Sequence, residues 1–371
     1  MSTTTTSQLM YVGTYTKAGH PGRGRADGIY VYQVDPQSGA LTHLHTIADV
    51  ANPSFIAFHS NGRFVYTVNE ALETDGHPGG GVSAFARDPD TGDLTFINRE
   101  PSHGTDPCHL SVDPTGSYVL VANYSSGSVA VLPIDETGRL HPVSYVDQRS
   151  GSSVNPKRQQ GPHAHAIVVD PSGKFALSPD LGMDQVFVYR LAADGQLQHN
   201  EPVGARVAPG EGPRHLDFHP TKPLVYVINE LGSSVTTFAW DAAAGTLNEL
   251  QNVSTLPAGY GGDTTCADIH VAPSGRFVYG SNRGHDSIAA FAIDDETGTL
   301  TPIGHTPTGG QTPRNFAIDP SGRFLFAANQ NTDTVVTFRL DETTGQLTAT
   351  DQTTAVPSPV CLKFAPASGT R

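Results

Sequence analysis

Short apolar runs, each bounded by turn-forming residues, recur along the whole chain at a spacing that a helix does not produce. Segments such as "HLSVDPTGSYVLVAN" and "NFAIDPSGRFLFAAN" each hold two β-branched or aromatic runs around a Pro–Thr–Gly or Pro–Ser–Gly turn. This pattern is typical of a β-hairpin. A third run follows each hairpin, for example "SVTTFAW" or "TVVTFRL". No segment keeps a helical period over a useful length, so the pattern predicts an all-β protein.

A second repeated element, seen in "DPDTGDLTFI" and "DETGTLTPI", follows the third run and introduces a fourth strand. Its Asp/Thr/Gly cluster predicts a hairpin turn in which Gly supplies a positive φ. The element occurs seven times, about 50 residues apart, with its glycines at Gly39, Gly92, Gly138, Gly195, Gly245, Gly298 and Gly345. Seven units of four antiparallel strands predict a seven-bladed β-propeller.

The two ends of the chain complement each other. The first unit begins at "LMYVGTY" without an innermost strand, and the chain closes with "PSPVCLKFAP", which is an innermost strand without a blade. We therefore expect the C-terminal strand to join blade one and close the ring, which removes exposed strand edges. The expected organisation is a single domain over residues 1–371, with the folded ring at 8–366.

Function in a repeat protein is expected where the copies differ. Antiparallel strands bring the start of the innermost strand and the end of the second strand to the same end of a blade. His165 and Arg214 occupy the first position, and Glu230 and Arg283 follow the second. These four side chains should converge on one mouth of the central channel. The nearly uniform Asn before the Glu230 position, for example Asn123, is most simply structural, because Asn bonds nearby backbone.

The charge and composition exclude several kinds of partner. The net charge of −14 disfavours nucleic acid or an anionic membrane. No apolar stretch approaches the roughly 20 residues needed to cross a bilayer, and no secretory signal is visible. Three widely spaced cysteines give no disulfide framework, which suits a reducing compartment. We expect a cytoplasmic protein in which an anionic substrate needs a local cationic pocket.

Three irregular loops, at residues 16–28, 72–81 and 150–165, are expected on the face that carries the four residues. The third brings Arg158 within reach of a bound anion. His163 and His165 with His109 or His215 are conceivable metal ligands, but no carboxylate or Cys accompanies them at metal spacing. No nucleophile elbow, zinc-protease or phosphate-loop motif is present. We therefore expect neither a metal nor a cofactor.

The chain resembles the seven-bladed lactonase family, which includes cycloisomerase-type 6-phosphogluconolactonases and the carboxy-cis,cis-muconate lactonizing enzyme. The resemblance covers nearly the whole chain and is most specific in "NPKRQQGPHAHAI", "GEGPRHLDFHP" and "VINELGSSV". It implies an active site of His165, Arg214, Glu230 and Arg283, the residues that the blade comparison selects. It implies a lactone hydrolase, first of all a 6-phosphogluconolactonase of the pentose phosphate pathway that converts 6-phospho-D-glucono-1,5-lactone to 6-phosphogluconate. Lactonizing activity on a muconate-like diacid, hydrolysis of another sugar lactone and a non-enzymatic binding scaffold are the alternatives.

Hydrolysis of a lactone needs a base, an oxyanion stabiliser and a proton donor for the leaving oxygen. His165 or Glu230 can transfer the proton, and His165 is favoured because a neighbouring Arg should lower the pKa of Glu230. Arg214 and Arg283 would bind the anionic group and stabilise the oxyanion. Further substrate contacts are expected from His163, His109, His215, Arg314, Arg158 and Asn123. The substrate is a small anionic lactone, and a closed ring is expected to be a monomer.

Overall fold

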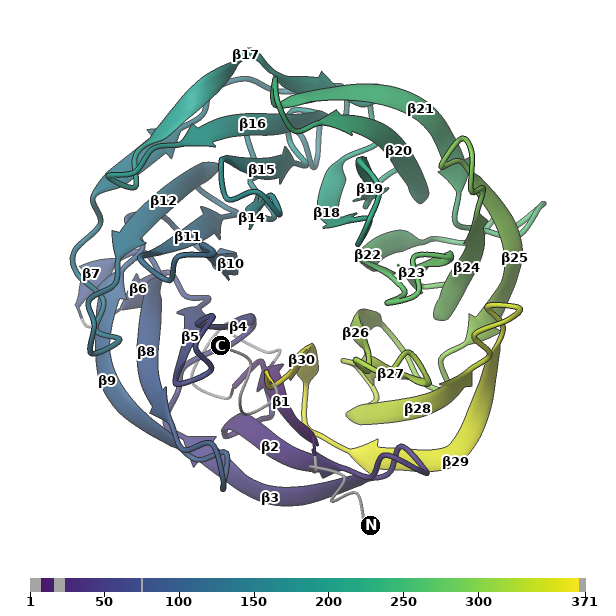
Figure 1. The fold of residues 1–371 in the computed structure, drawn as a ribbon, viewed down its shortest axis with the longest axis horizontal. Helices are drawn as coiled ribbons and strands as arrows, with labels where there is room; N and C mark the ends of the chain where they lie inside the picture. The colour runs from purple at the N-terminus through teal and green to yellow at the C-terminus, as the bar shows by residue number, and fades with distance from the viewer. Residues whose placement is uncertain (1–7, 17–23, 75, 367–371) are drawn as a thin grey trace.

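Antiparallel strands follow one another around a central axis in seven four-stranded sheets, as Figure 1 shows. The computed structural model describes residues 8–16, 24–74 and 76–366. Strands and turns account for the secondary structure of this part of the chain, and no helix occurs in it. The prediction of an all-β propeller with seven blades of four strands is confirmed.

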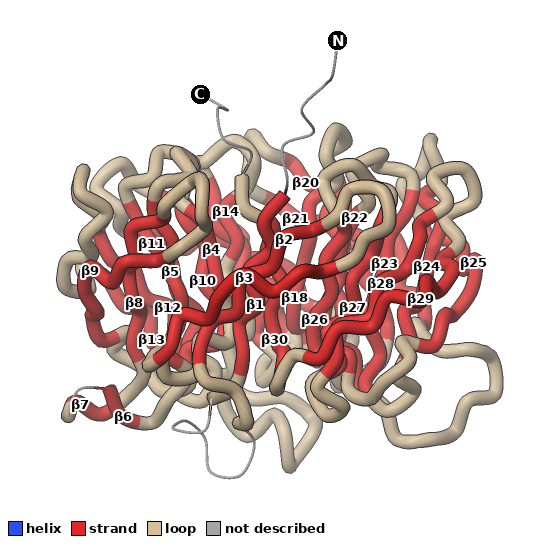
Figure 2. Tube along the Cα trace, turned by 90° about the horizontal axis from the view of Figure 1, so that it is seen from below, coloured by secondary structure: helices blue, strands red, loops and turns tan. Residues whose placement is uncertain are grey.

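Each blade runs from an innermost strand beside the axis to an outermost strand at the rim. In that order, blade one is β30 (Pro359–Phe364), β1 (Gln8–Thr14), β2 (Gly28–Val34) and β3 (Leu41–Ala48); blade two is β4 (Ile56–Phe58), β5 (Phe64–Asn69), β8 (Gly81–Arg87) and β9 (Leu94–Pro101); blade three is β10 (Pro107–Val112), β11 (Tyr118–Asn123), β12 (Ser128–Pro133) and β13 (Tyr145–Gln148). Blade four is β14 (Val168–Val169), β15 (Phe175–Asp180), β16 (Gln185–Leu191) and β17 (Leu197–Arg206); blade five is β18 (Pro213–Phe218), β19 (Leu224–Asn229), β20 (Ser234–Asp241) and β21 (Thr246–Ser254). Blade six is β22 (Thr265–Val271), β23 (Phe277–Arg283), β24 (Ser287–Ile293) and β25 (Leu300–Pro307); blade seven is β26 (Pro313–Ile318), β27 (Phe324–Asn329), β28 (Thr334–Leu340) and β29 (Leu347–Ala355). A separate hairpin of β6 (Glu73–Thr74) and β7 (His77–Pro78) lies at the edge of one loop-bearing face, at the bottom of Figure 2.

The ring closes between the two ends of the chain, as predicted. Strand β30 pairs antiparallel with β1, with Met10 opposite Phe364 and Val12 opposite Leu362. Leu362 is 2% exposed and packs in a core cluster shared by blades one and seven. The last strand therefore completes the first blade and joins it to the seventh.

The seven repeated glycines form hairpin turns and also join neighbouring blades. All seven have φ between 71 and 80°, in the left-handed region that Gly tolerates. The buried hydroxyl of Tyr66 in blade two donates to the carbonyl of Gly138 in blade three. A Cβ atom at Gly138 would lie 2.3 Å from the ring of Phe64, so no larger residue fits there without displacement. The repeat thus fixes both the turn and the contact between blades.

The innermost strands are irregular where they reach the face that carries the site. The pairing register shifts at Cys108 in blade three, Arg214 in blade five and Arg314 in blade seven. A β-bulge adds one unpaired residue and redirects side chains, so two consecutive residues can face the same side. Cys108 and His109 accordingly both line cavities along the axis.

Blade four departs furthest from the predicted repeat. The repeat predicts an innermost strand that includes the run after His165, but β14 holds only two residues. Ala164 forms an isolated bridge with Asp180, and the backbone N–H of His165 donates to the carbonyl of Pro179. Proline has no N–H to donate in return, which interrupts the ladder at this point.

Candidate active site

A cavity of about 430 Å³ lies at one end of the central axis. Tyr15 follows β1 and Glu70 follows β5, so the cavity lies on the face where the β6–β7 hairpin begins. Six of the seven blades and the loop before β14 contribute to its wall, with the lining residues Tyr15, Glu70, Asp106, Cys108, Tyr124, Ser125, Arg158, His165, Glu230, Arg283 and Arg314. Guanidinium, hydroxyl and carboxylate groups make up most of this wall.

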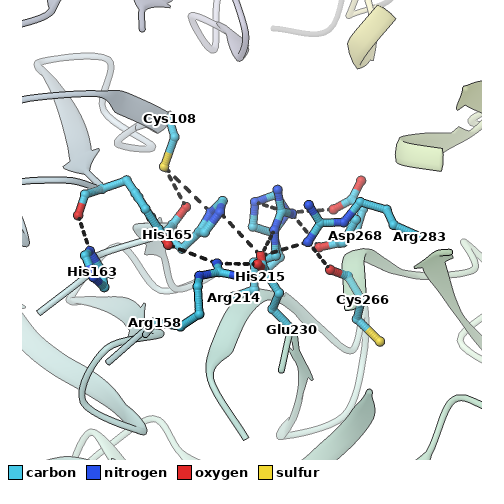
Figure 3. A network of polar contacts seen from close by, with 12 residues as sticks. Cys108, Arg158, His163, His165, Arg214, His215, Glu230, Cys266, Asp268 and Arg283 are labelled. Carbon is cyan, nitrogen blue, oxygen red and sulfur yellow. Dashed lines mark hydrogen bonds and ion pairs between the residues drawn. The ribbon is translucent and has the colours of Figure 1, made fainter. Parts of the chain in front are cut away.

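The Glu230 carboxylate is paired with three guanidinium groups, as Figure 3 shows. Its Oε1 lies 2.7 Å from Nη2 of Arg158. Its Oε2 lies 3.0 Å from Nε of Arg214 and 2.9 Å from Nη2 of Arg283. The Glu230 side chain is only 5% exposed, so water screens these ion pairs little. Three positive charges around one negative charge leave the cluster with a surplus of positive charge.

The protonation states in this cluster follow from burial and from the neighbouring charges. Burial alone would raise the pKa of Glu230, but Arg283, Arg214 and Arg158 outweigh it and hold that pKa well below its usual value. Burial, with the charges of Arg314 and Arg283, lowers the pKa of Arg214 to about 10. Glu230 is therefore ionised and Arg214 protonated at neutral pH.

His165 lies beside the cluster as a neutral imidazole. Its Nε2 is 3.9 Å from Oε2 of Glu230, and its Nδ1 is 3.6 Å from Sγ of Cys108. Its ring meets that of Tyr124 edge-on at 5.2 Å. Burial lowers its pKa well below the usual value, and the charge of Arg214 adds to the effect. The imidazole is therefore unprotonated at neutral pH, as a general base must be before it acts.

A second layer of hydrogen bonds holds Arg214. Its Nη1 donates to the carbonyl of Ala267 at 2.5 Å and lies 3.2 Å from Nε2 of His215. Nδ1 of His215 lies 2.7 Å from Oδ1 of Asp268, and Asp268 also bonds Nε2 of His270 at 3.0 Å. Burial and Arg214 lower the pKa of His215 to about 4, so its ring is neutral, donates from Nδ1 and accepts from Arg214.

Arg314 differs from Arg158 and Arg283, the other arginines that line the cavity. It forms no hydrogen bond or ion pair with any residue in the described part of the chain, and its guanidinium carbon lies 5.6 Å from the ring centroid of Tyr15. Arg158 differs, since its Nη2 also donates to the hydroxyl of Tyr124 at 3.1 Å. A bound anion would therefore find in Arg314 a cation that no protein carboxylate occupies.

The structure brings most of the predicted site residues together. His165, Glu230, Arg283, Arg314 and Arg158 line the cavity. Arg214, 2% exposed, lies behind its wall and reaches Glu230. The catalytic and binding roles of these residues stay predictions.

Three histidines expected to contact substrate do not line this cavity. Nδ1 of His163 bonds the carbonyl of Tyr124 at 3.0 Å, and the two rings stack at 4.6 Å, so His163 lies behind Tyr124. His109 and His215 line a different space of about 300 Å³ further along the axis. The bulges place His109 and His215 deeper along the axis, and Tyr124 stacks on His163, so none of the three lines this cavity. Their predicted contacts with substrate stay predictions.

Asn123 does not line the cavity either. It is fully buried, and its Nδ2 donates to the carbonyl of Ser102 at 3.3 Å and to the hydroxyl of Ser128 at 3.1 Å. Its amide joins strand ends within the fold instead of facing substrate. The structural interpretation of the repeated Asn is the correct one.

Several lining residues are not selected by the sequence patterns. Glu70 and Tyr124 occupy the same repeat position as Glu230 and Arg283, so the blade comparison contains the signal for them. Tyr15 lies in "YVGTYT", but nothing in its spacing indicates a cavity. Residues 17–23, in the first of the three predicted loops, lie outside the described residues.

Within the described ranges, no group of three or more His, Cys, Asp or Glu side chains is arranged to hold a metal ion. The three thiols, Cys108, Cys266 and Cys361, are buried and unpaired. Burial raises the pKa of each of them, so the thiols are protonated at neutral pH. The same part of the chain contains no helix long and apolar enough to cross a membrane.

Fold and site together define a propeller protein whose axial cavity suits a small anionic molecule. Residues 9–364 match the model of the family described as Lactonase, 7-bladed beta-propeller. The chain is 39% identical over 360 residues to the 6-phosphogluconolactonase of Bacillus subtilis (strain 168), covering 97% of this chain and 99% of that protein. The chain belongs to this seven-bladed lactonase family.

Solved structures agree over nearly full length. A protein from Bacteroides fragilis superposes with a TM-score of 0.90 at 38% identity, covering 99% of this chain and 100% of that one. The Pseudomonas aeruginosa periplasmic gluconolactonase, PpgL, gives a TM-score of 0.90 at 36% identity, covering 97% of this chain and 99% of that one.

Proposed function

We infer that this protein is a lactone hydrolase, specifically a 6-phosphogluconolactonase that converts 6-phospho-D-glucono-1,5-lactone to 6-phosphogluconate. The full-length similarity to the Bacillus subtilis enzyme supports the activity. The observation that carries the assignment is the cavity itself, where three guanidinium groups surround Glu230 and Arg314 has no carboxylate partner among the described residues. An acidic protein with net charge −14 concentrates cations at this cavity, where an anionic substrate needs them.

His165 is the proposed base. A water molecule attacks the lactone carbonyl carbon while the neutral imidazole takes its proton. The imidazolium that forms faces Oε2 of Glu230 at 3.9 Å, which stabilises the new positive charge. When the bond between the carbonyl carbon and the ring oxygen breaks, the imidazolium returns the proton to that oxygen. The new carboxylic acid then loses its proton to solvent.

Arg283 is the proposed oxyanion stabiliser, and Arg214 supports it from behind the wall. Arg283 lines the cavity, and its Nη2 is anchored between Oε2 of Glu230 and the carbonyl of Cys266 at 2.6 Å. A fixed guanidinium needs little rearrangement as charge develops on the carbonyl oxygen. Glu230 has the role of holding these cations in place, because its lowered pKa makes it a poor proton acceptor.

The test is hydrolysis of freshly prepared 6-phosphogluconolactone beside gluconolactone, each corrected for spontaneous opening. We expect enzymatic acceleration for both and a higher kcat/KM for the phosphorylated lactone. Absence of acceleration for both would contradict the assignment to the lactone hydrolases.

Hydrolysis of the unphosphorylated lactone is the second candidate function. The similarity to the Pseudomonas aeruginosa periplasmic gluconolactonase favours it, since the two chains superpose with a TM-score of 0.90. A kcat/KM for gluconolactone equal to or above that for the phosphorylated substrate would support this second candidate.

We further propose that the protein acts in the cytoplasm as a monomer and takes part in the pentose phosphate pathway. The three unpaired buried thiols support a reducing compartment. The closed ring leaves no innermost strand edge to pair with a second chain. Light scattering on the purified protein measures the oligomeric state, and cell fractionation measures the location.

A further inference from the structure

The cavity has two chemically different walls. Arg158, Arg283 and Arg314 contribute positive charge on one side. Around the rest of the ring, Tyr15 and Glu70 contribute a phenol and a carboxylate, and Ser125 and Asp106 a hydroxyl and a second carboxylate. The proposed hydrolytic mechanism uses the cationic wall and leaves the acidic wall without a role.

Glu70 is held by hydroxyl groups and not by cations. The Tyr15 hydroxyl lies 2.9 Å from its Oε1 and 3.0 Å from its Oε2, and the Ser54 hydroxyl donates to Oε2 at 2.5 Å. No ion pair joins Glu70 to any Lys, Arg or His among the residues described. Tyr15 and Ser54 are each 5% exposed, so this arrangement is built into the fold.

The hydrogen-bonding capacity of Glu70 is not used up. Two carboxylate oxygens offer about four lone-pair directions. Tyr15 and Ser54 each have one hydroxyl proton to give, so acceptor capacity remains on a carboxylate that faces the cavity. Substrate hydroxyl groups are suitable donors, whereas a carboxylate group at this position would be repelled.

Arg314 lies next to this carboxylate without being bound by it. Its guanidinium carbon is 5.6 Å from the Tyr15 ring, and Tyr15 bonds Glu70. A cation free to bind an anion therefore neighbours a carboxylate that can accept further hydrogen bonds from hydroxyl groups. That combination matches a molecule with both an anionic group and several hydroxyls.

We propose that Glu70, oriented by Tyr15 and Ser54, recognises the hydroxyl groups of the lactone, and that Arg314 binds its phosphate. This inference rests on the proposed function and extends it to the substrate class. Glu70 selects polyhydroxylated sugar lactones and rejects diacids, whose second carboxylate would face it. Tyr15 and Ser54 are positioning residues for Glu70.

Binding measurements test this assignment separately from catalysis. Isothermal titration calorimetry compares 6-phosphogluconate, gluconate and 6-phosphohexanoate, which keeps both anionic ends but has no hydroxyl groups between them. Wild-type protein should bind 6-phosphogluconate most tightly. Glu70→Gln should weaken 6-phosphogluconate binding about 10- to 100-fold, as expected for a hydrogen bond to a charged group, and leave 6-phosphohexanoate within threefold.

Arg314→Met provides the complementary result. It should weaken both phosphorylated ligands about 10- to 100-fold while leaving gluconate within threefold. Glu296→Gln, which removes an exposed carboxylate in a hairpin turn, is the matched control and should change none of the three affinities. Far-UV circular dichroism and thermal melting establish that each variant is folded.

Tyr15→Phe keeps the experiment decisive if Glu70→Gln does not fold. It retains the carboxylate, removes one of its two hydroxyl donors and should reduce the preference for 6-phosphogluconate over 6-phosphohexanoate about threefold or more. A wild-type protein without that preference, or a Glu70 variant that weakens both ligands equally, overturns the inference. If the lactones are hydrolysed normally in that case, the proposed function stands and only the subsite assignment fails.

Discussion

His165 and Glu230 lie side by side and yet are suited to different tasks. Burial keeps the imidazole neutral, whereas three guanidinium groups keep the carboxylate ionised. Each group would be ambiguous as an isolated residue, because both His and Glu can transfer protons. Their environments therefore suit His165 to accept a proton and Glu230 to hold the neighbouring arginines in place.

Replacing His165 with Asn should remove the base while keeping a polar side chain of similar size. We expect kcat for lactone hydrolysis to fall about 10²- to 10⁴-fold, the range typical of a lost general base. His141→Asn, at a histidine whose side chain is 52% exposed, is the control and should stay within twofold. Turnover of the His165 variant within twofold of wild type would exclude the proposed role.

Replacing Glu230 with Gln should destabilise the substrate-free protein, because three buried or half-buried guanidinium groups lose their counter-charge. Removal of one partner from a buried ion pair costs about 3–5 kcal/mol. An added anion should compensate in part, so inorganic phosphate should raise Tm more in the variant than in wild type. Thermal melting with and without phosphate measures both effects, and equal phosphate shifts in the two proteins would contradict this account.

At the scale of the elements, bulges in the innermost strands determine which side chains reach the cavity. The irregular registers at Cys108, Arg214 and Arg314 place consecutive residues along the axis at two depths. His215 and Asp268 lie deeper along the axis than the cavity. His215 contacts the Arg214 guanidinium and is itself hydrogen-bonded to Asp268. A regular strand would turn every second side chain away from the axis.

Ring closure through β30 makes a prediction about stability. Leu362→Ala deletes a buried side chain in the cluster shared by blades one and seven, and we expect it to cost about 2–5 kcal/mol. Leu250→Ala, at a side chain that is 44% exposed, should change the free energy of unfolding by less than about 0.5 kcal/mol. Urea denaturation measures both values, and similar small effects would show that closure contributes little.

The sequence predicts the architecture well because each repeat carries the same turn chemistry. The positive-φ glycines and the paired apolar runs specify a blade without knowledge of the other blades. The depth of His109 and the position of Asn123 could not be predicted in this way, since they depend on bulges and on contacts between sequence-distant segments. The shortened β14 likewise depends on Pro179 in the strand opposite.

For the whole molecule, buried histidines predict how stability varies with pH. Burial lowers the pKa of His165 and His109 well below the usual value and that of His215 to about 4. The unfolded chain binds these protons at about pH 6.5, so below that pH it holds more protons than the folded protein. The free energy of unfolding should therefore decrease as the pH falls from about 7 toward 4.

His270 acts in the opposite direction. Burial alone would lower its pKa, but Asp268 and Asp217 raise it to about 9. Its stabilising contribution is complete below about pH 6.5 and is lost as the pH rises through about 9. Urea denaturation from pH 4 to 10 should give a maximum near neutrality, and a value independent of pH between 4 and 7 would contradict the assigned protonation states.

The pairing of β1 with β30 also has a consequence for synthesis of the protein. During translation, the ribosome synthesises Tyr15 and Glu70 long before Arg314. Strand β30, which completes blade one, is synthesised after all of them. The finished cavity therefore forms only after β30 has been synthesised, and chains that terminate before β30 carry an open sheet edge in place of a binding site.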